Sequence, residues 1–198
     1  MRNRIRSAGL MLLLVFSLTR TGWTGDKKDK EGHLKAKLVG FQEVPAISSK
    51  GTGEFTATIS SDDSKIDYAL SWSNLEGGNP LFAHIHFGQL SVNGGVSAFL
   101  CSSSGTSPAG TPPCPAATSG KVEGTITAAS VIGPADRGIA PGEFAELLRA
   151  IRTGNAYVNI HTPTWMGGEI RAQLNTRGKG LFVLQDVSHH HDDDDDDE

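Results

Sequence analysis

The sequence lacks an excess of positive charge, and this limits the partners it can have. It contains 18 Lys and Arg residues against 22 Asp and Glu residues. Four of the basic residues lie in the first 24 positions, and seven of the acidic ones form the run 192–198, so the body of the chain is near neutral. A near-neutral body has no basic footprint for nucleic acid, and we expect no nucleic-acid partner.

The sequence also lacks an apolar run long enough to span a bilayer, which takes about 20 residues. The apolar run at 8–18 is shorter, and it follows a basic start that contains Arg2, Arg4 and Arg6. This order is typical of a secretory signal peptide. We expect a signal peptide over 1–24, a secreted or periplasmic mature protein, and no membrane association after the signal is removed. An uncleaved tethering segment is the alternative.

Internal repeats are absent, and helical periodicity is confined to one convincing stretch. Phe144, Leu147, Leu148 and Ile151 share one face of a helix predicted over 143–152. Short alternating runs predict strands over 33–39, 53–60, 66–72, 82–87, 96–101, 121–127, 155–162, 169–174 and 180–187. We therefore expect an all-β fold, an immunoglobulin-like or Greek-key β-sandwich with one short amphipathic helix, in a single domain over 33–187 after a polar lead-in at 25–32.

Only two cysteines are present, Cys101 and Cys114, separated by a Ser, Gly and Pro-rich stretch. In an exported chain, a disulfide that closes this loop is the economical interpretation, and a thiol metal site is the rival one. The end of the chain, 188–198, joins His189, His190 and His191 to the acidic run. We expect this tail to be disordered and to chelate divalent cations loosely, or to act as a solubilising tail. An affinity-tag remnant is a further possibility.

Three histidines lie in two of the predicted strands. His84 and His86 are two residues apart and share a face, while His161 points to the polar face of a second strand. If the two strands are neighbours, three imidazoles meet, and such a set suits copper or zinc. Glu169 is the candidate for a fourth ligand or for a supporting hydrogen bond, unless Arg171 neutralises it; Glu43 is a weaker candidate. A metal-free polar cluster is the alternative.

Four segments, 38–45, 83–88, 154–162 and 168–174, occur in an order that resembles a CHRD domain, the module named after chordin. The resemblance covers roughly 34–174, and it implies an immunoglobulin-like or Greek-key β-sandwich outside the cytoplasm, with no settled activity. The pair His84 and His86 is also similar to the copper-binding pair of copper-zinc superoxide dismutase. That enzyme needs a fuller histidine set, so we do not expect a two-metal dismutase.

These observations favour a noncatalytic exported binding module that takes a divalent metal ion, copper or zinc, through the three histidines. One alternative is a structural or adhesion domain that meets an extracellular protein or surface partner. The other is a mononuclear copper or zinc enzyme, which is disfavoured because no nucleophile elbow, second acid/base pair or cofactor loop accompanies the histidines.

Overall fold

The computed structural model describes residues 32–105 and 107–174. The signal peptide expected over 1–24, most of the lead-in, the strand expected over 180–187 and the tail at 188–198 lie outside the described residues. The expectations for these segments therefore stay predictions.

The described residues form an antiparallel sheet and a single α-helix, α1 (Phe144–Arg152). The strands are β1 (Gly32–Val39), β2 (Thr52–Ile59), β3 (Ile66–Ser73), β4 (Phe82–Phe87), β5 (Gly95–Ser102), β6 (Gly120–Ile126), β7 (Ala156–His161) and β8 (Ile170–Leu174). They pair in one sheet of 8 strands in the order β5-β4-β7-β8-β1-β2-β3-β6. The predicted all-β fold with one short helix is confirmed.

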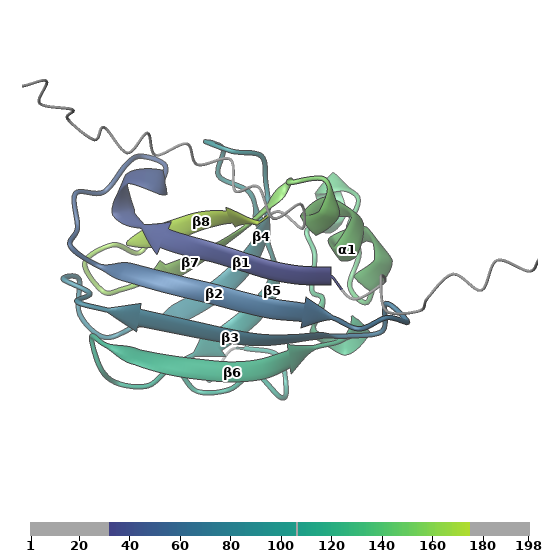
Figure 1. Ribbon diagram of the computed structural model, residues 1–198, viewed down its shortest axis with the longest axis horizontal. Helices are drawn as coiled ribbons and strands as arrows, with labels where there is room; N and C mark the ends of the chain where they lie inside the picture. The colour runs from purple at the N-terminus through teal and green to yellow at the C-terminus, as the bar shows by residue number, and fades with distance from the viewer. Residues whose placement is uncertain (1–31, 106, 175–198) are drawn as a thin grey trace, which may run out of the picture.

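The sheet folds over so that its two halves lie one behind the other. In Figure 1, strands β1, β2, β3 and β6 cross in front of β4, β5, β7 and β8. Alternate residues of each strand point between the halves, where Phe55, Leu70, Ile85 and Val158 are fully buried. The other residues of each strand point outward, and this outer face carries His84 and His86 on β4 and His161 on β7, with Arg171 on the neighbouring β8.

Helix α1 covers one end of the folded sheet (Figure 1). Its predicted apolar stripe is confirmed, because Phe144, Leu147, Leu148 and Ile151 are all buried in the core. At its C-terminal end, the guanidinium of Arg152 donates to both carboxylate oxygens of Asp63, at 2.9 and 2.6 Å. This pair ties the helix to the turn between β2 and β3.

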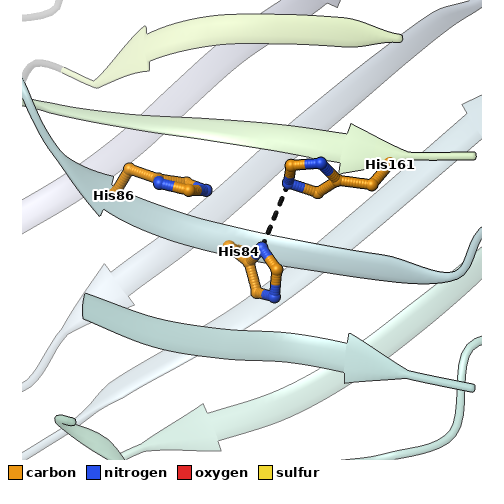
Figure 2. A group of neighbouring side chains, drawn as sticks. All are labelled: His84, His86 and His161. Atoms are coloured by element: carbon orange, nitrogen blue, oxygen red, sulfur yellow. Dashed lines mark hydrogen bonds between the residues drawn. The ribbon is translucent and has the colours of Figure 1, made fainter. Parts of the chain in front are cut away.

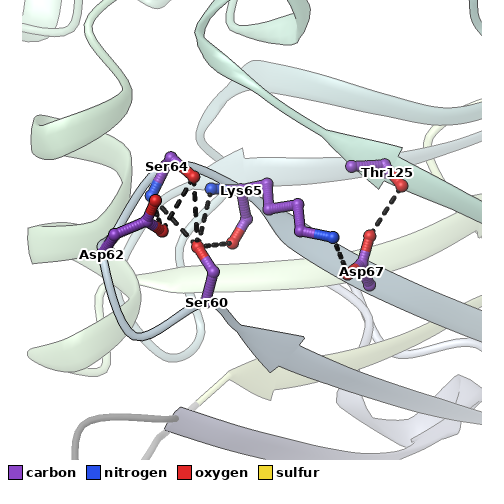
Figure 3. A network of polar contacts seen from close by, with 6 residues as sticks. All are labelled: Ser60, Asp62, Ser64, Lys65, Asp67 and Thr125. Carbon is purple, nitrogen blue, oxygen red and sulfur yellow. Dashed lines mark hydrogen bonds and ion pairs between the residues drawn. The ribbon is translucent and has the colours of Figure 1, made fainter.

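That turn is held by short polar contacts, which Figure 3 shows. The hydroxyl oxygen of Ser60 accepts from the backbone N–H groups of Ser64 and Lys65, both at 3.1 Å. Farther along β3, Asp67 accepts from Lys65 and from Thr125 of β6, each at 2.7 Å. These contacts are exposed, so they fix the turn but contribute little to stability.

The cysteine pair forms the predicted disulfide between Cys101, at the end of β5, and Cys114. Both residues are buried, and Cys101 lies opposite Ala83 of the histidine strand β4. The disulfide therefore closes the loop after β5 at the edge of the same half-sheet that carries the histidines.

Replacing both cysteines by serine (Cys101→Ser with Cys114→Ser) should lower the free energy of unfolding by about 3 kcal/mol. The reason is that the bond spans 13 residues and restricts the unfolded chain by about that much. Urea denaturation of the two proteins measures the difference. Equal midpoints and slopes would show that the bond adds no stability.

Candidate metal centre

Strand β7 lies between β4 and β8, so three neighbouring strands contribute to one outer face. The register places His84 opposite Asn159 and His86 opposite Tyr157, and Asn159 in turn opposite Arg171. Directly opposed side chains on one face of an antiparallel pair are close neighbours. The adjacency of the two histidine strands, on which the sequence prediction depends, is therefore confirmed.

The three imidazoles converge on this face. Nδ1 of His84 lies 3.1 Å from Nε2 of His161, and one ligand atom from each of His84, His86 and His161 lies within 4.8 Å of the others. Figure 2 shows a ring nitrogen of His86 pointing toward the space between the other two rings. The three residues are only 6–7% exposed, so the cluster is enclosed by protein.

Backbone carbonyls fix the tautomer of two of the rings. Nδ1 of His86 lies 3.0 Å from the carbonyl oxygen of Gly94, and Nδ1 of His161 lies 2.9 Å from that of Met166. Because a carbonyl only accepts hydrogen bonds, each Nδ1 carries the proton, and the lone pair of each neutral ring is on Nε2. The Nε2 lone pair of His86 is therefore free, whereas that of His161 accepts a hydrogen bond from Nδ1–H of His84.

Burial keeps all three rings neutral. It lowers the pKa of His84 to about 2, with further lowering by His161 and His86. Burial lowers the pKa of His86 to about 4, although the Gly94 carbonyl acts in the opposite direction. The pKa of His161 is also lowered by burial, against the effect of the Met166 carbonyl. Neutral imidazole is the form that binds metal ions, so near neutral pH no proton has to leave first.

A stack of planar groups holds His86 in place. The rings of His86 and Tyr157 lie parallel, with centroids 4.7 Å apart and planes at 4°. The guanidinium of Arg171 lies 3.5 Å from the centre of the Tyr157 ring. The Tyr157 hydroxyl accepts from the backbone N–H of Gly94 at 3.1 Å, so the loop after β4 and the stack position each other.

Glu43 reaches the same face from the loop after β1. It is 5% exposed, and burial raises its pKa to about 7, against the opposing effects of Arg171, of the Asn159 amide and of the Val44 backbone. A Cβ on Gly168 would overlap Oε1 of Glu43, so glycine is required where the two loops meet. Glu43, the weaker candidate, is not one of the residues whose ligand atoms converge, but its carboxyl and the Asn159 amide both border Gly168.

Glu169 has a different set of partners. Its carboxylate accepts from the hydroxyls of Ser49 at 2.7 Å and Thr162 at 2.9 Å, and from the backbone N–H groups of Glu76 at 2.7 Å and Gly77 at 3.1 Å. Both oxygens are therefore engaged by loops, and Glu169 is not one of the residues whose ligand atoms converge.

Arg171 also has partners that the sequence did not indicate. It donates to the carbonyls of Gln89 at 3.2 Å and Val92 at 3.0 Å. The contributions of Gly94 and Met166 were missed as well. Both act through backbone carbonyls, and no residue type in the sequence marks such a role.

The chain is an antiparallel β-fold, and three neutral histidines converge on its outer face. This combination defines the class of protein as an all-β protein with a candidate mononuclear metal centre. A comparison with protein families matches the CHRD domain over residues 34–174, and the chain belongs to the CHRD domain family. No curated protein and no solved structure matches the chain. Within 32–105 and 107–174, no helix has the length and apolar character that crossing a membrane requires.

Protonation of His86 should destabilise the metal-free fold in acid. Its pKa is about 4 in the fold and about 6.5 in the unfolded chain, so stability is lost as pH falls from about 6.5 toward about 4. Glu43, with its raised pKa, acts in the opposite direction over an overlapping range.

The wild type must therefore be compared with His86→Gln, which keeps a donor for Gly94. Between about pH 7 and about pH 4.5, we expect the wild type to lose about 2–3 kcal/mol more than the variant in chelator-treated urea titrations. Equal losses of stability in the wild type and in His86→Gln would contradict a buried, neutral His86 ring.

The substitution Glu169→Gln should lower the free energy of unfolding by about 2 kcal/mol, since an amide group cannot accept all four hydrogen bonds. The matched control is Glu54→Gln on β2, whose carboxylate is exposed and pairs with Lys35 at 3.1 Å. Urea denaturation measures both, and we expect little change in the control. A Glu169→Gln protein as stable as the control would show that these loops do not depend on the carboxylate.

Proposed function

We propose that the protein is an exported, noncatalytic CHRD-domain module that binds one copper or zinc ion through His84, His86 and His161. The observation that carries this proposal is the convergence of one ligand atom from each histidine to within 4.8 Å of the others. We assign Nε2 of His86, Nε2 of His161 and Nδ1 of His84 as the ligand atoms. The Nδ1 proton of His84, which is donated to His161 in the metal-free fold, would have to move to Nε2 of the same ring when the ion binds.

The donor set and its surroundings fit such an ion. Two nitrogens that bind one zinc ion at about 2.0–2.1 Å with tetrahedral geometry lie about 3.4 Å apart, and the closest pair in the cluster is already at 3.1 Å. Nε2 of His86 is buried without a hydrogen-bond partner. A buried nitrogen that is aimed at the other rings and lacks a partner is suited to a ligand bond. Imidazole suits both copper and zinc.

The carbonyl contacts of His86 and His161 give further support. In metal sites, the ring nitrogen that does not bind the ion usually donates to a carboxylate, a carbonyl or water, which orients the ring. Gly94 and Met166 fill this role in the chain. The role predicted for Glu169 stays a prediction, and the proposal does not need it.

Export is supported by the family and by the disulfide between Cys101 and Cys114. The basic and apolar start of the sequence agrees with it. We infer a secreted or periplasmic protein. The alternatives are a structural or adhesion domain with a metal-free polar cluster, and a mononuclear enzyme.

Calorimetric titration with Cu²⁺ and Zn²⁺ tests the proposal. The protein should carry alanine at His189, His190 and His191, because tail histidines bind metal themselves. We expect one ion per chain, and loss of binding by at least about tenfold in His86→Ala, since a three-ligand site loses a ligand. The matched control is His33→Ala, which removes an exposed histidine of β1 and should leave binding unchanged.

Absence of binding in the parent protein, or equal affinity in both variants, would contradict the proposal and favour the metal-free domain. Redox or hydrolytic turnover by the loaded protein would favour the enzyme.

A further inference from the structure

Besides the histidines, Asn159 and Glu43 each have a buried polar atom without a partner. Asn159 is 2% exposed and Glu43 is 5% exposed. Oδ1 of Asn159 and Oε1 of Glu43 have no hydrogen-bond partner in the part of the chain that the structure describes. Buried polar atoms in native proteins are nearly always paired, so each such oxygen calls for an explanation. Oxygens of three other described residues also lack a partner, namely Gln42, Ser97 and Gln173. Asn159 differs from these because it lies directly opposite His84.

Asn159 connects the Glu43 carboxyl to the strands of the candidate metal centre. Asn159 is directly opposite His84 and two residues before His161 on the same face of β7. Its side chain acts on His86 and on Glu43, shifting the pKa of each. Asn159 is therefore a neighbour of His84 on β4, and its amide and the Glu43 carboxyl both border Gly168.

The loops leave room for this arrangement. Gly168 has a φ of +130°, and a Cβ at this position would overlap Oε1 of Glu43 and lie 2.8 Å from Nδ2 of Asn159. The absence of a side chain at Gly168 is thus what lets the Glu43 carboxyl approach the Asn159 amide.

The chemistry of the two atoms indicates the class of ligand. Both are oxygens that accept hydrogen bonds, so they fit a small donor. A second cation is disfavoured, because the positive charge of Arg171 acts on the same carboxyl. Water or hydroxide meets the requirement, and a metal ion with three protein ligands commonly keeps a fourth position for it.

We propose that Asn159 and Glu43 hold a solvent ligand, water or hydroxide, on the ion bound by His84, His86 and His161. This inference rests on the proposed function, and it makes the fourth coordination position exchangeable. It replaces a fourth protein ligand such as Glu169, whose oxygens already accept four hydrogen bonds.

The test uses the full chain with alanine at His189, His190 and His191, loaded with one equivalent of Cu²⁺. Pulsed electron paramagnetic resonance in D₂O should detect exchangeable deuterons of a coordinated solvent molecule. Azide should then displace that molecule and produce a charge-transfer absorption band. The deuteron measurement needs no substitution, so it does not depend on a variant that folds.

The variant Glu43→Gln tests whether the carboxyl of Glu43 lies beside the solvent ligand. At about pH 8, above its pKa of about 7, the Glu43 carboxylate repels azide. We therefore expect the variant to bind azide several-fold more tightly than the parent. The matched control Glu54→Gln removes an exposed carboxylate of β2 and should bind azide as the parent does.

The outcomes separate the two proposals. Copper binding without exchangeable deuterons and without an azide band would overturn the solvent ligand while leaving the three-histidine centre. An azide affinity that Glu43→Gln does not change would overturn the assignment of Glu43. Absence of copper binding would overturn both proposals.

Discussion

The burial of Arg171 is the interaction on which the histidine face depends. Its side chain is 1% exposed, and its guanidinium donates to the carbonyls of Gln89 and Val92 while lying over the ring of Tyr157. These contacts hold the loop after β4 against the outer face of the sheet. The same loop supplies Gly94, whose carbonyl accepts from His86 and whose N–H donates to Tyr157. A buried charge without such partners would be strongly destabilising, so the loop and the guanidinium stabilise each other.

Buried polar groups in this protein fall into two kinds. Glu169 accepts four hydrogen bonds and joins loops around it, which is a structural use of a buried charge. Asn159, Glu43 and His86 each keep one buried atom without a partner, at a cost of about 1–3 kcal/mol per atom. Asn159 and His86 lie on the paired strands β7 and β4, and Glu43 borders Gly168 together with the Asn159 amide. Four other described residues also keep a buried polar atom without a partner: His84, Gln42, Ser97 and Gln173. What distinguishes the two histidines in this set is that their ligand atoms converge with that of His161.

Alternation along the chain was enough to predict the strands and the side of the sheet on which His84, His86 and His161 lie. It could not establish that β4 and β7 pair, since that contact joins residues far apart in the sequence, from Phe82 with His161 to Phe87 with Ala156. Glu169 shows a second limit. It is two residues before Arg171, so alternation along a strand would place both side chains on the same face. Glu169 lies just before β8 (Ile170–Leu174), however, and at a strand end the loops decide where a side chain points. Glu43 lies in an irregular corner, where no periodicity relates its direction to the distant histidines.

The charge balance of the candidate centre, were it to take up an ion, gives the buried carboxyl of Glu43 a role. Three neutral imidazoles add no charge, and Arg171 already contributes one positive charge that lowers the pKa of His86. An incoming cation would add to that charge in an enclosed site, where Coulomb repulsion is strong. Burial holds the pKa of Glu43 at about 7, so a nearby cation favours release of its proton. The charge of the centre then rises by about one unit less than the charge of the ion. A carboxyl with an ordinary pKa would already be ionised, and the metal-free fold would then contain an ionised carboxylate in the same enclosed position.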